Sequence, residues 1–260
     1  MLAVGMLCVL LLGTAGAGKS TMVSALSKLL GEVGEQHLAA NLDPGAEYIP
    51  YRPDYDIREH FTVRSIMSEE GLGPNSAQVR AVERIAEQAD ELLKPLWSSG
   101  AEVVLVDTPG QLEIFAFREA GPRLVSYLQE KARVAGVFLI DAALPSTLAE
   151  TVLTLTLAKA VELRLEAPMV AVLNKVDVLP EGRRALLKRM VEEMSMDEAV
   201  EAVYSDSSGL VAEMAAEIAG ILVKYRTASR VALASAISGE GLKEVYDLLN
   251  EIFCVCGDTT

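Results

Sequence analysis

Cysteine, histidine and aromatic residues are scarce in this chain of 260 residues, which has three cysteines, two histidines and 5% aromatics. A sparse and odd set of cysteines predicts no disulfide framework and a reducing compartment, so we expect a cytoplasmic protein. Few aromatics among 51% hydrophobic residues predict an aliphatic core. We interpret Cys254 and Cys256 as small hydrophobic residues at a helix end, with a soft-metal site as the alternative.

The sequence also lacks a basic run and a long apolar run. It has 23 Lys and Arg against 37 Asp and Glu, for a formal net charge of −14. Such a chain repels a phosphodiester backbone, so we expect no direct binding to nucleic acid. No apolar stretch has the length of a membrane span, and we expect no membrane partner. The apolar residues 1–12 lack the basic segment and cleavage site of a signal peptide, so we interpret them as a buried first strand.

Short apolar runs alternate with helical patterns along the rest of the chain. The expected strands are residues 6–12, 37–42, 102–107, 136–141, 169–173 and 230–234, and helical patterns between them include residues 20–30 and 119–132. Nearly continuous apolar strands are typical of parallel sheets that are buried on both faces. The alternation predicts an α/β fold with a doubly wound, mainly parallel sheet flanked by helices. Ligands of such sheets bind beyond the carboxyl ends of the strands.

Two segments interrupt this alternation. Residues 44–101 follow the second expected strand and are nearly twice as long as the helix and strand of a simple βαβ unit. We interpret them as an insertion with a polar loop over 44–55, a glycine-rich turn over 71–75, and one helix whose apolar stripe covers 79–96. Residues 181–225 predict two or more helices outside the sheet, before the last strand. We expect a single domain over residues 1–260.

A phosphate-binding pattern follows the first expected strand. The residues Gly13-Thr14-Ala15-Gly16-Ala17-Gly18-Lys19-Ser20 fit G-x-x-x-x-G-K-[ST]. The glycines permit a tight loop whose backbone amides turn toward phosphate oxygens, Lys19 supplies a positive charge, and Ser20 offers a hydroxyl to Mg²⁺. The positive end of the following helix adds to this site. We therefore predict a nucleotide-binding loop made of these eight residues and Thr21.

A second motif ends the strand expected over residues 102–107. Asp107 stands where such a site holds Mg²⁺, and Asp107-Thr108-Pro109-Gly110 completes the pattern D-x-x-G. The Gly110 amide can contact the γ-phosphate, and Gln111 can orient an attacking water. We predict Mg²⁺ as the cofactor, with Ser20 and Asp107 at the metal.

A base-reading motif follows the strand expected over residues 169–173. In Asn174-Lys175-Val176-Asp177, the Asp177 carboxylate can accept hydrogen bonds from N1–H and N2–H₂ of guanine, a pair of donors that adenine lacks. Lys175 can lie across the base, and Asn174 can tie this loop to the phosphate-binding loop. After the last expected strand, Ser235 and Ala236 fit the backbone loop that closes over the guanine oxygen. These residues predict GTP and GDP as ligands.

Two further motifs narrow the choice. Asp43-Pro44 follows the second expected strand, and Gly73-Pro74-Asn75 lies in the insertion. Together with the segment from Asp107 to Gln111, they resemble the GPN-loop GTPase family, and the match includes Leu72 and the four residues from Asp56. The family motif continues with glycine where Ser76 stands, and serine favours the start of a helix.

This resemblance implies hydrolysis of GTP to GDP and phosphate in a homodimer. It implies that Asn75 reaches the phosphates of the opposite subunit, while Asp43 and Gln111 position the water. It also implies a nucleotide-driven switch that acts on protein-assembly clients such as RNA polymerase components.

Three alternatives stay open beside this interpretation. A GTP-dependent metallochaperone needs exposed metal ligands, for which Cys254 and Cys256 are the support. An ATPase of the partitioning type shares Asp43-Pro44 but carries an early second lysine in the phosphate loop, where this chain has Thr14. A nucleotide-binding scaffold without turnover would carry the same motifs.

Overall fold

One parallel sheet organises the computed structural model, which describes residues 5–225 and 230–254. Its strands are β1 (Leu7–Gly13), β2 (His37–Asn41), β3 (Tyr55–Asp56), β4 (Val103–Asp107), β5 (Arg133–Asp141), β6 (Met169–Asn174) and β7 (Val231–Leu233). They lie in the order β3-β2-β4-β1-β5-β6-β7, and each pair of neighbours is parallel. The predicted α/β fold is confirmed, and the sheet is wholly rather than mainly parallel.

Alternate side chains of the strands enter two separate cores. In β1, Cys8, Leu10 and Leu12 pack on one face of the sheet, and Val9 and Leu11 pack on the other. The first face is covered by α7 (Ala120–Lys131) and α8 (Leu148–Leu165), and the second by α1 (Lys19–Val33) and α13 (Leu242–Cys254). Full burial of each such aliphatic side chain contributes about 1.5–3 kcal/mol, so the sheet is a firm support for the loops at its edge.

The insertion after β2 differs from its prediction. It contains β3, the short helix η1 (Ile57–Glu59), α2 (Val63–Glu70), α3 (Pro74–Glu87), α4 (Ala89–Leu92) and α5 (Lys94–Trp97). The single helix expected over 79–96 is wrong, because the backbone leaves helical geometry at Gln88 and Leu93 and divides the segment into three helices. Helix α3 begins at Pro74 with Gly73 as its N-cap, so Ser76 is not the helix start.

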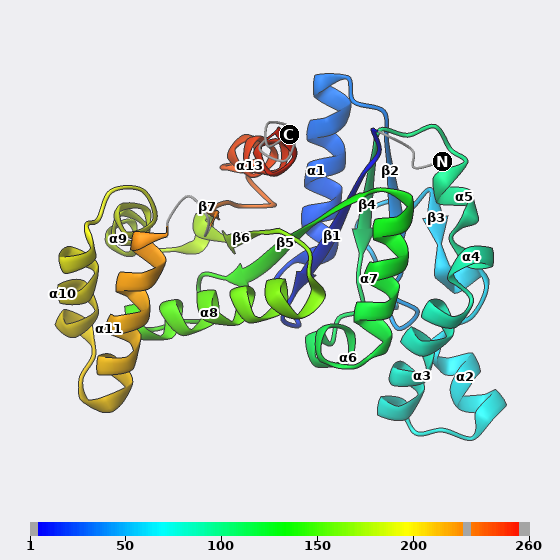
Figure 1. Cartoon of the computed structure of the whole chain (residues 1–260), viewed down its shortest axis with the longest axis horizontal. Coiled ribbons are helices and arrows are strands. Elements are labelled where there is room, and N and C mark those ends of the chain that lie inside the picture. The colour runs from blue at the N-terminus through cyan, green and yellow to red at the C-terminus, as the bar shows by residue number, and fades with distance from the viewer. Residues whose placement is uncertain (1–4, 226–229, 255–260) are drawn as a thin grey trace.

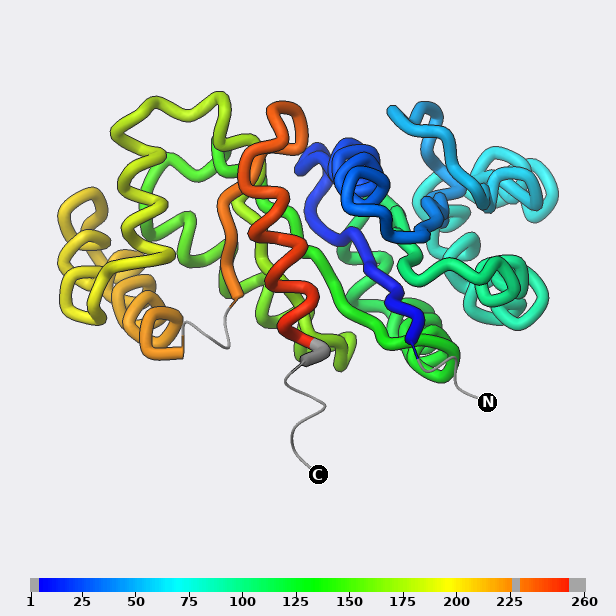
Figure 2. Tube along the Cα trace, turned by 90° about the horizontal axis from the view of Figure 1, so that it is seen from above, coloured from blue at the N-terminus to red at the C-terminus, as the bar shows by residue number. Residues whose placement is uncertain are grey.

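Most of the remaining helices follow β6 in the sequence. The helices α9 (Glu181–Glu192), α10 (Met196–Asp206) and α11 (Gly209–Lys224) stand at one end of the long axis, with α2–α5 at the other (Figures 1 and 2). The expected helices over 181–225 are therefore confirmed. Two shorter elements, α6 (Leu112–Phe117) and η2 (Val176–Val178), follow β4 and β6. Among the described residues, no helix has the length and apolarity to cross a membrane.

Candidate nucleotide-binding site

The phosphate-binding loop joins β1 to α1 through three glycines with positive φ. These are Gly13, Gly16 and Gly18, at 140°, 77° and 94°. A Cβ at Gly13 would lie 2.3 Å from the Leu139 carbonyl oxygen, so only glycine fits there. The loop therefore owes its shape to backbone conformations that other residues rarely adopt.

Lys19 lies inside this loop, with 8% of its surface exposed. Its Nζ donates to the carbonyl oxygens of Gly13 at 3.0 Å, Thr14 at 3.2 Å and Gly110 at 3.5 Å. Burial lowers the pKa of Lys19, and the carboxylates of Asp107 and Asp43 oppose that shift. The ammonium is thus held at the centre of the loop, between the β1 and β4 ends.

Asp107 ends β4 beside the loop, where the strand register places it opposite Leu11 of β1. Its side chain is 2% exposed, and burial raises its pKa to about 6 against hydrogen bonds from Ser20 and Tyr51. The Tyr51 hydroxyl donates to Oδ2 at 3.1 Å. Sequence reasoning missed Tyr51, because a tyrosine in a polar loop carries no signal of its distant partner.

The Asp43 carboxylate bridges two backbone amides. Its Oδ1 accepts from the Gly45 amide at 2.8 Å, and its Oδ2 accepts from the Gly110 amide at 3.0 Å. Burial raises the pKa of Asp43, and both amide bonds and Lys19 lower it. The amide that the D-x-x-G pattern offers to a γ-phosphate is therefore engaged by a carboxylate of the same chain.

An ion pair between Asp56 and Arg58 stabilises the segment that carries Asp43. The Arg58 guanidinium donates Nε and Nη2 to the Asp56 carboxylate at 2.6–3.1 Å and Nη1 to the Ala46 carbonyl at 2.8 Å. Asn41 donates to Asp56 at 2.9 Å and accepts from the Asp43 amide at 3.0 Å. A bidentate pair with further hydrogen bonds fixes orientation well, so the position of Asp43 is set by β2, β3 and η1 together.

Asn174, at the end of β6, joins the base-reading loop to the phosphate-binding loop. Its side chain is 1% exposed; Nδ2 donates to the Ala17 carbonyl at 2.8 Å, and Oδ1 accepts from the Ala236 amide at 3.1 Å. A Cβ at Gly18 would lie 2.7 Å from that Nδ2. One amide therefore connects three segments that are far apart in the chain.

The other predicted base-site residues lie around this amide. Lys175 has a φ of 68°, and its Nζ contacts the Asp141 carboxylate at 2.6 Å. Asp177 follows in η2 with an exposed side chain. The buried Ser235 hydroxyl accepts from the amides of Ile237 and Ser238, which shapes the loop after β7. Sequence reasoning missed Asp141, although it is the last residue of the strand expected over 136–141.

Asn75 is not with these residues. It is exposed in the first turn of α3, beside an open depression of about 380 Å³. The other residues around this depression are Glu70, Leu72, Ser76, Val79, Arg80, Glu83 and Arg118, and none belongs to the phosphate-binding loop. Gly73 and Pro74 are exposed as well, so the tripeptide lies on the outer surface of the insertion.

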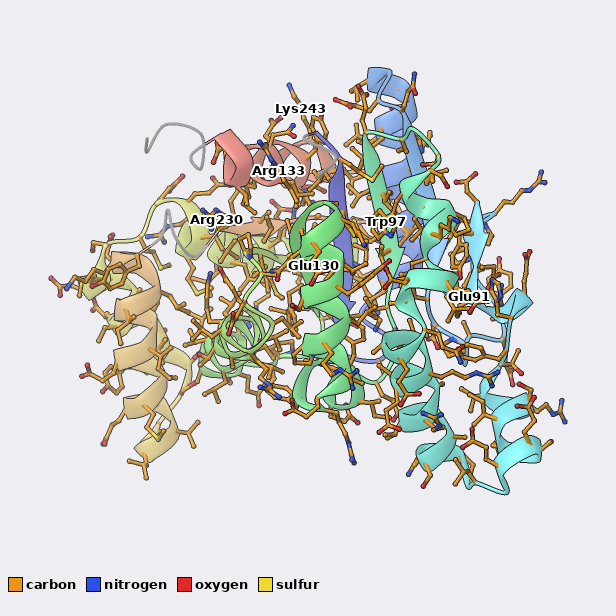
Figure 3. All side chains as sticks on the ribbon, turned by 45° about the vertical axis from the view of Figure 1, so that its right-hand side comes forward. Glu91, Trp97, Glu130, Arg133, Arg230 and Lys243 are labelled. Atoms are coloured by element: carbon orange, nitrogen blue, oxygen red, sulfur yellow. The ribbon has the colours of Figure 1, made fainter. Side chains whose placement is uncertain are left out.

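A groove lies at the other end of the sheet. It has a volume of about 560 Å³, and the starts of β1, β4 and β5 line it together with Glu35, Trp97, Arg133 and Tyr246. Figure 3 labels Trp97 and Arg133 in the upper half of the view. Parallel sheets bind ligands at the carboxyl ends of their strands, and this groove is at the amino ends, so its size does not make it the nucleotide site.

The fold and the loop geometry define a P-loop nucleotide-binding protein. A family model described as "Conserved hypothetical ATP binding protein" matches residues 11–255. GPN-loop GTPase PAB0955 of Pyrococcus abyssi is 33% identical over 254 residues, which are 97% of this chain and 99% of that protein. GPN-loop GTPase 3 of Aspergillus fumigatus is 34% identical over 189 residues, 70% of this chain and 64% of that protein.

A solved structure agrees with these relatives. The crystal structure of PAB0955, described as a GTPase in apo form, has a TM-score of 0.83 and 32% identity, and the match covers 97% of this chain and 100% of that one. The chain belongs to the GPN-loop GTPase family, as the motifs around Asp43, Asn75 and Gln111 predicted.

Proposed function

We propose that this protein binds GTP with Mg²⁺ and hydrolyses it to GDP and phosphate. The observation that carries the proposal is the side chain of Asn174, which hydrogen bonds to Ala17 of the phosphate-binding loop and to Ala236. It brings a cradle of backbone amides and the Asp177 carboxylate to the same edge of the sheet. One nucleotide can then contact both, with its phosphates on Gly13–Lys19 and its guanine on Asp177.

The proposed roles follow from the contacts of each group. Lys19 exchanges its carbonyl partners for the β- and γ-phosphates, where an ammonium inside a water-poor loop is strongly stabilising. The Gly110 amide leaves Asp43 and donates to the γ-phosphate. Asp43 and Gln111 then align a water for attack on the γ-phosphorus, and the bond to the bridging oxygen of GDP breaks.

The metal proposal rests on the donor set. The Ser20 hydroxyl lies near the Asp107 carboxylate and lowers its pKa, and hydroxyl and carboxylate oxygens are the ligands that Mg²⁺ prefers. Bound there, Mg²⁺ would neutralise charge on the β- and γ-phosphates. The deprotonated form of Asp107 is the one that holds the metal, and the Tyr51 hydroxyl would remain its outer hydrogen-bond donor.

We further propose a homodimer in which Asn75 acts on the partner's nucleotide. The exposed place of Asn75 on α3, apart from its own phosphate-binding loop, supports this role. An amide donor from a second chain can stabilise phosphate charge, so dimerisation would complete each site. We infer a cytoplasmic switch whose clients are assembling proteins, among them RNA polymerase components, from the family resemblance and the sparse cysteines.

The metallochaperone alternative has less support. Cys8 is fully buried, and burial raises the pKa of its thiol to about 12, so it is a poor ligand. Among the described residues, no group of three or more His, Cys, Asp and Glu side chains is arranged to hold a metal ion. Cys256 and the side chain of Cys254 lie outside the described residues.

Competition between nucleotides tests the proposed ligand. Displacement of a fluorescent GDP analogue should require about 100-fold more ATP than GTP, because adenine offers the Asp177 carboxylate one exocyclic amine in the wrong place and no N1–H. Tighter binding of ATP would contradict the proposal and agree with the ATP-binding description of the matching family.

Replacement of Asn75 with alanine tests the action across the dimer. The change should lower kcat by about tenfold or more, as expected for loss of one donor to the transition state, while the affinity for GDP stays within about twofold. In mixed dimers of an Asn75→Ala chain with a Lys19→Ala chain, the Asn75→Ala chain keeps its phosphate-binding lysine and receives the intact Asn75 of its partner. The other site lacks both groups, so these dimers should hydrolyse GTP at one site. Full activity in Asn75→Ala homodimers would exclude the trans role, and Ser76→Ala serves as the matched control.

A further inference from the structure

Gln78 has a buried side-chain oxygen without a protein partner. It lies on the first turns of α3, and its Oε1 is one of two such atoms among the described residues, the other being the Tyr55 hydroxyl. An unpaired buried acceptor costs about 1–3 kcal/mol, and proteins seldom leave one unpaired. The site around Gln78 therefore needs a group that donates a hydrogen bond to it.

A small, partly open cavity lies beside this oxygen. The cavity has a volume of about 80 Å³, and its lining joins Gln78 to the residues proposed for water attack: Asp43, Pro44, Gly45, Val63, Val82, Pro109, Gly110, Gln111 and Ile114. Since a water molecule occupies about 30 Å³ in the liquid, the cavity is large enough for one or two. Helix α3 thus contributes Gln78 to the same cavity as Asp43.

The chemistry of the lining decides whether water enters. A cavity lined only by apolar groups stays dry, and a buried water needs two to four polar partners. Val63, Val82 and Ile114 form an apolar wall here. Gln78, Asp43 and Gln111 also line the cavity and supply polar groups.

We propose that this cavity holds a water anchored by Gln78, and that this water donates to Asp43 during hydrolysis. The role rests on the proposed function. In the described state Asp43 Oδ2 accepts from the Gly110 amide at 3.0 Å. When that amide turns to the γ-phosphate, Oδ2 loses a donor in a buried position, and the anchored water replaces it. Gln78 is then a positioning residue that keeps the Asp43 carboxylate aligned on the attacking water.

Helix α3 carries both Gln78 and the Asn75 that is proposed to act on the partner subunit. Asn75 and Gln78 lie three residues apart on α3, and Asn75 is exposed whereas the Gln78 oxygen is buried. One helix turn therefore presents an amide to the outside and a second amide to the site of its own chain.

Kinetics of two variants test the positioning role. Gln78→Leu keeps the size of the side chain and removes the acceptor, so kcat should fall roughly three- to tenfold with the dissociation constants for GDP and a non-hydrolysable GTP analogue unchanged. Gln78→Asn retains an amide and should recover most of the lost kcat. Gln88→Leu, an exposed glutamine at the end of the same helix, should leave kcat unchanged. Parent-like kcat in Gln78→Leu would overturn the role.

High-resolution crystal structures test the water itself. The parent protein should show a water within hydrogen-bonding distance of Gln78 Oε1 and the Asp43 carboxylate, and Gln78→Leu should lack it. A dry cavity in the parent would overturn this inference whether or not the protein hydrolyses GTP. If the water is present but the parent protein releases no phosphate from GTP, the water site is confirmed and the proposed hydrolysis is overturned. The melting temperature of Gln78→Leu, expected to equal or exceed the parent value, shows that the variant folds.

Discussion

Replacement of Asp107 with asparagine should lower the rate of GTP hydrolysis at least about 100-fold and at the same time stabilise the ligand-free protein. The first effect follows because a neutral amide is a weak ligand for Mg²⁺, and the charge on the phosphates then stays unneutralised. The second follows from burial. Asp107 is 2% exposed, and burial raises its pKa from 3.8 to about 6, so the ionised form is disfavoured in the folded state.

The size and the pH dependence of the stability gain can be stated. A shift of about two pKa units corresponds to about 2–3 kcal/mol at pH 7, as an upper limit for the gain in the variant. The folded-state pKa is the higher one, so the parent protein takes up a proton on folding between pH 6 and 4. Its stability relative to the variant therefore rises as the pH falls through 6, and the gain should vanish near pH 4.

Denaturant unfolding of both proteins without nucleotide at pH 7 and pH 4.5 measures this difference, and phosphate release measures turnover. Asp90→Asn is the matched control, because the Asp90 side chain is 86% exposed and should change neither quantity. A less stable Asp107→Asn protein at pH 7 would show that the carboxylate contributes to folding, against the burial argument. Unchanged phosphate release would contradict a metal role for Asp107 and favour another path of turnover.

Asp177→Asn should change which base the protein binds. The carboxylate accepts from two donors of guanine, and an amide can accept only one and turns its own N–H toward the other. Loss of such a charge-assisted pair should weaken GTP binding roughly 100- to 1,000-fold. Xanthine carries an oxygen where guanine has its amine, so the same amide should bind XDP and XTP better than the parent protein does.

Titration of both proteins with GDP and XDP measures the exchange of specificity. The phosphate-binding loop is the same in the two proteins, so tighter XDP binding by the variant also shows that its site is intact. If Asp177→Asn bound GDP as tightly as the parent, the base would have to lie elsewhere, although Asn174 places that loop beside the phosphate cradle.

The sequence predicted the parts of this molecule that depend on local pattern. Six strands and the ends of β1, β4 and β6 followed from apolar runs that stop at a glycine, an aspartate and an asparagine. Two-residue β3 was missed because it is too short for any periodicity, and its pairing with Ala40 and Asn41 is a tertiary contact. The prediction of one helix over 79–96 failed because a continuous apolar stripe does not reveal the interruptions of helical geometry at Gln88 and Leu93.

The site shows the same division. The spacing of motifs in the sequence predicted the glycines of the phosphate-binding loop, Lys19, Asp107 and Asn174, because binding a nucleotide requires these residue types at these intervals. Contacts made across the fold, such as Tyr51 with Asp107 over 56 positions or Lys175 with Asp141 over 34, are set by packing and leave no pattern in the chain. The resemblance implied that Asn75 acts outside its own subunit, and the structure shows it exposed in the first turn of α3.

The hydrogen bonds of Lys19 to backbone carbonyl oxygens bear on how the protein behaves without nucleotide. Three carbonyl oxygens, on Gly13, Thr14 and Gly110, already receive its ammonium. A buried cation that is solvated by its own backbone leaves the loop formed when no anion is present, so release of GDP need not unfold it. In the proposed nucleotide complex, Lys19 would exchange these carbonyl oxygens for phosphate oxygens, and the loop would keep its shape.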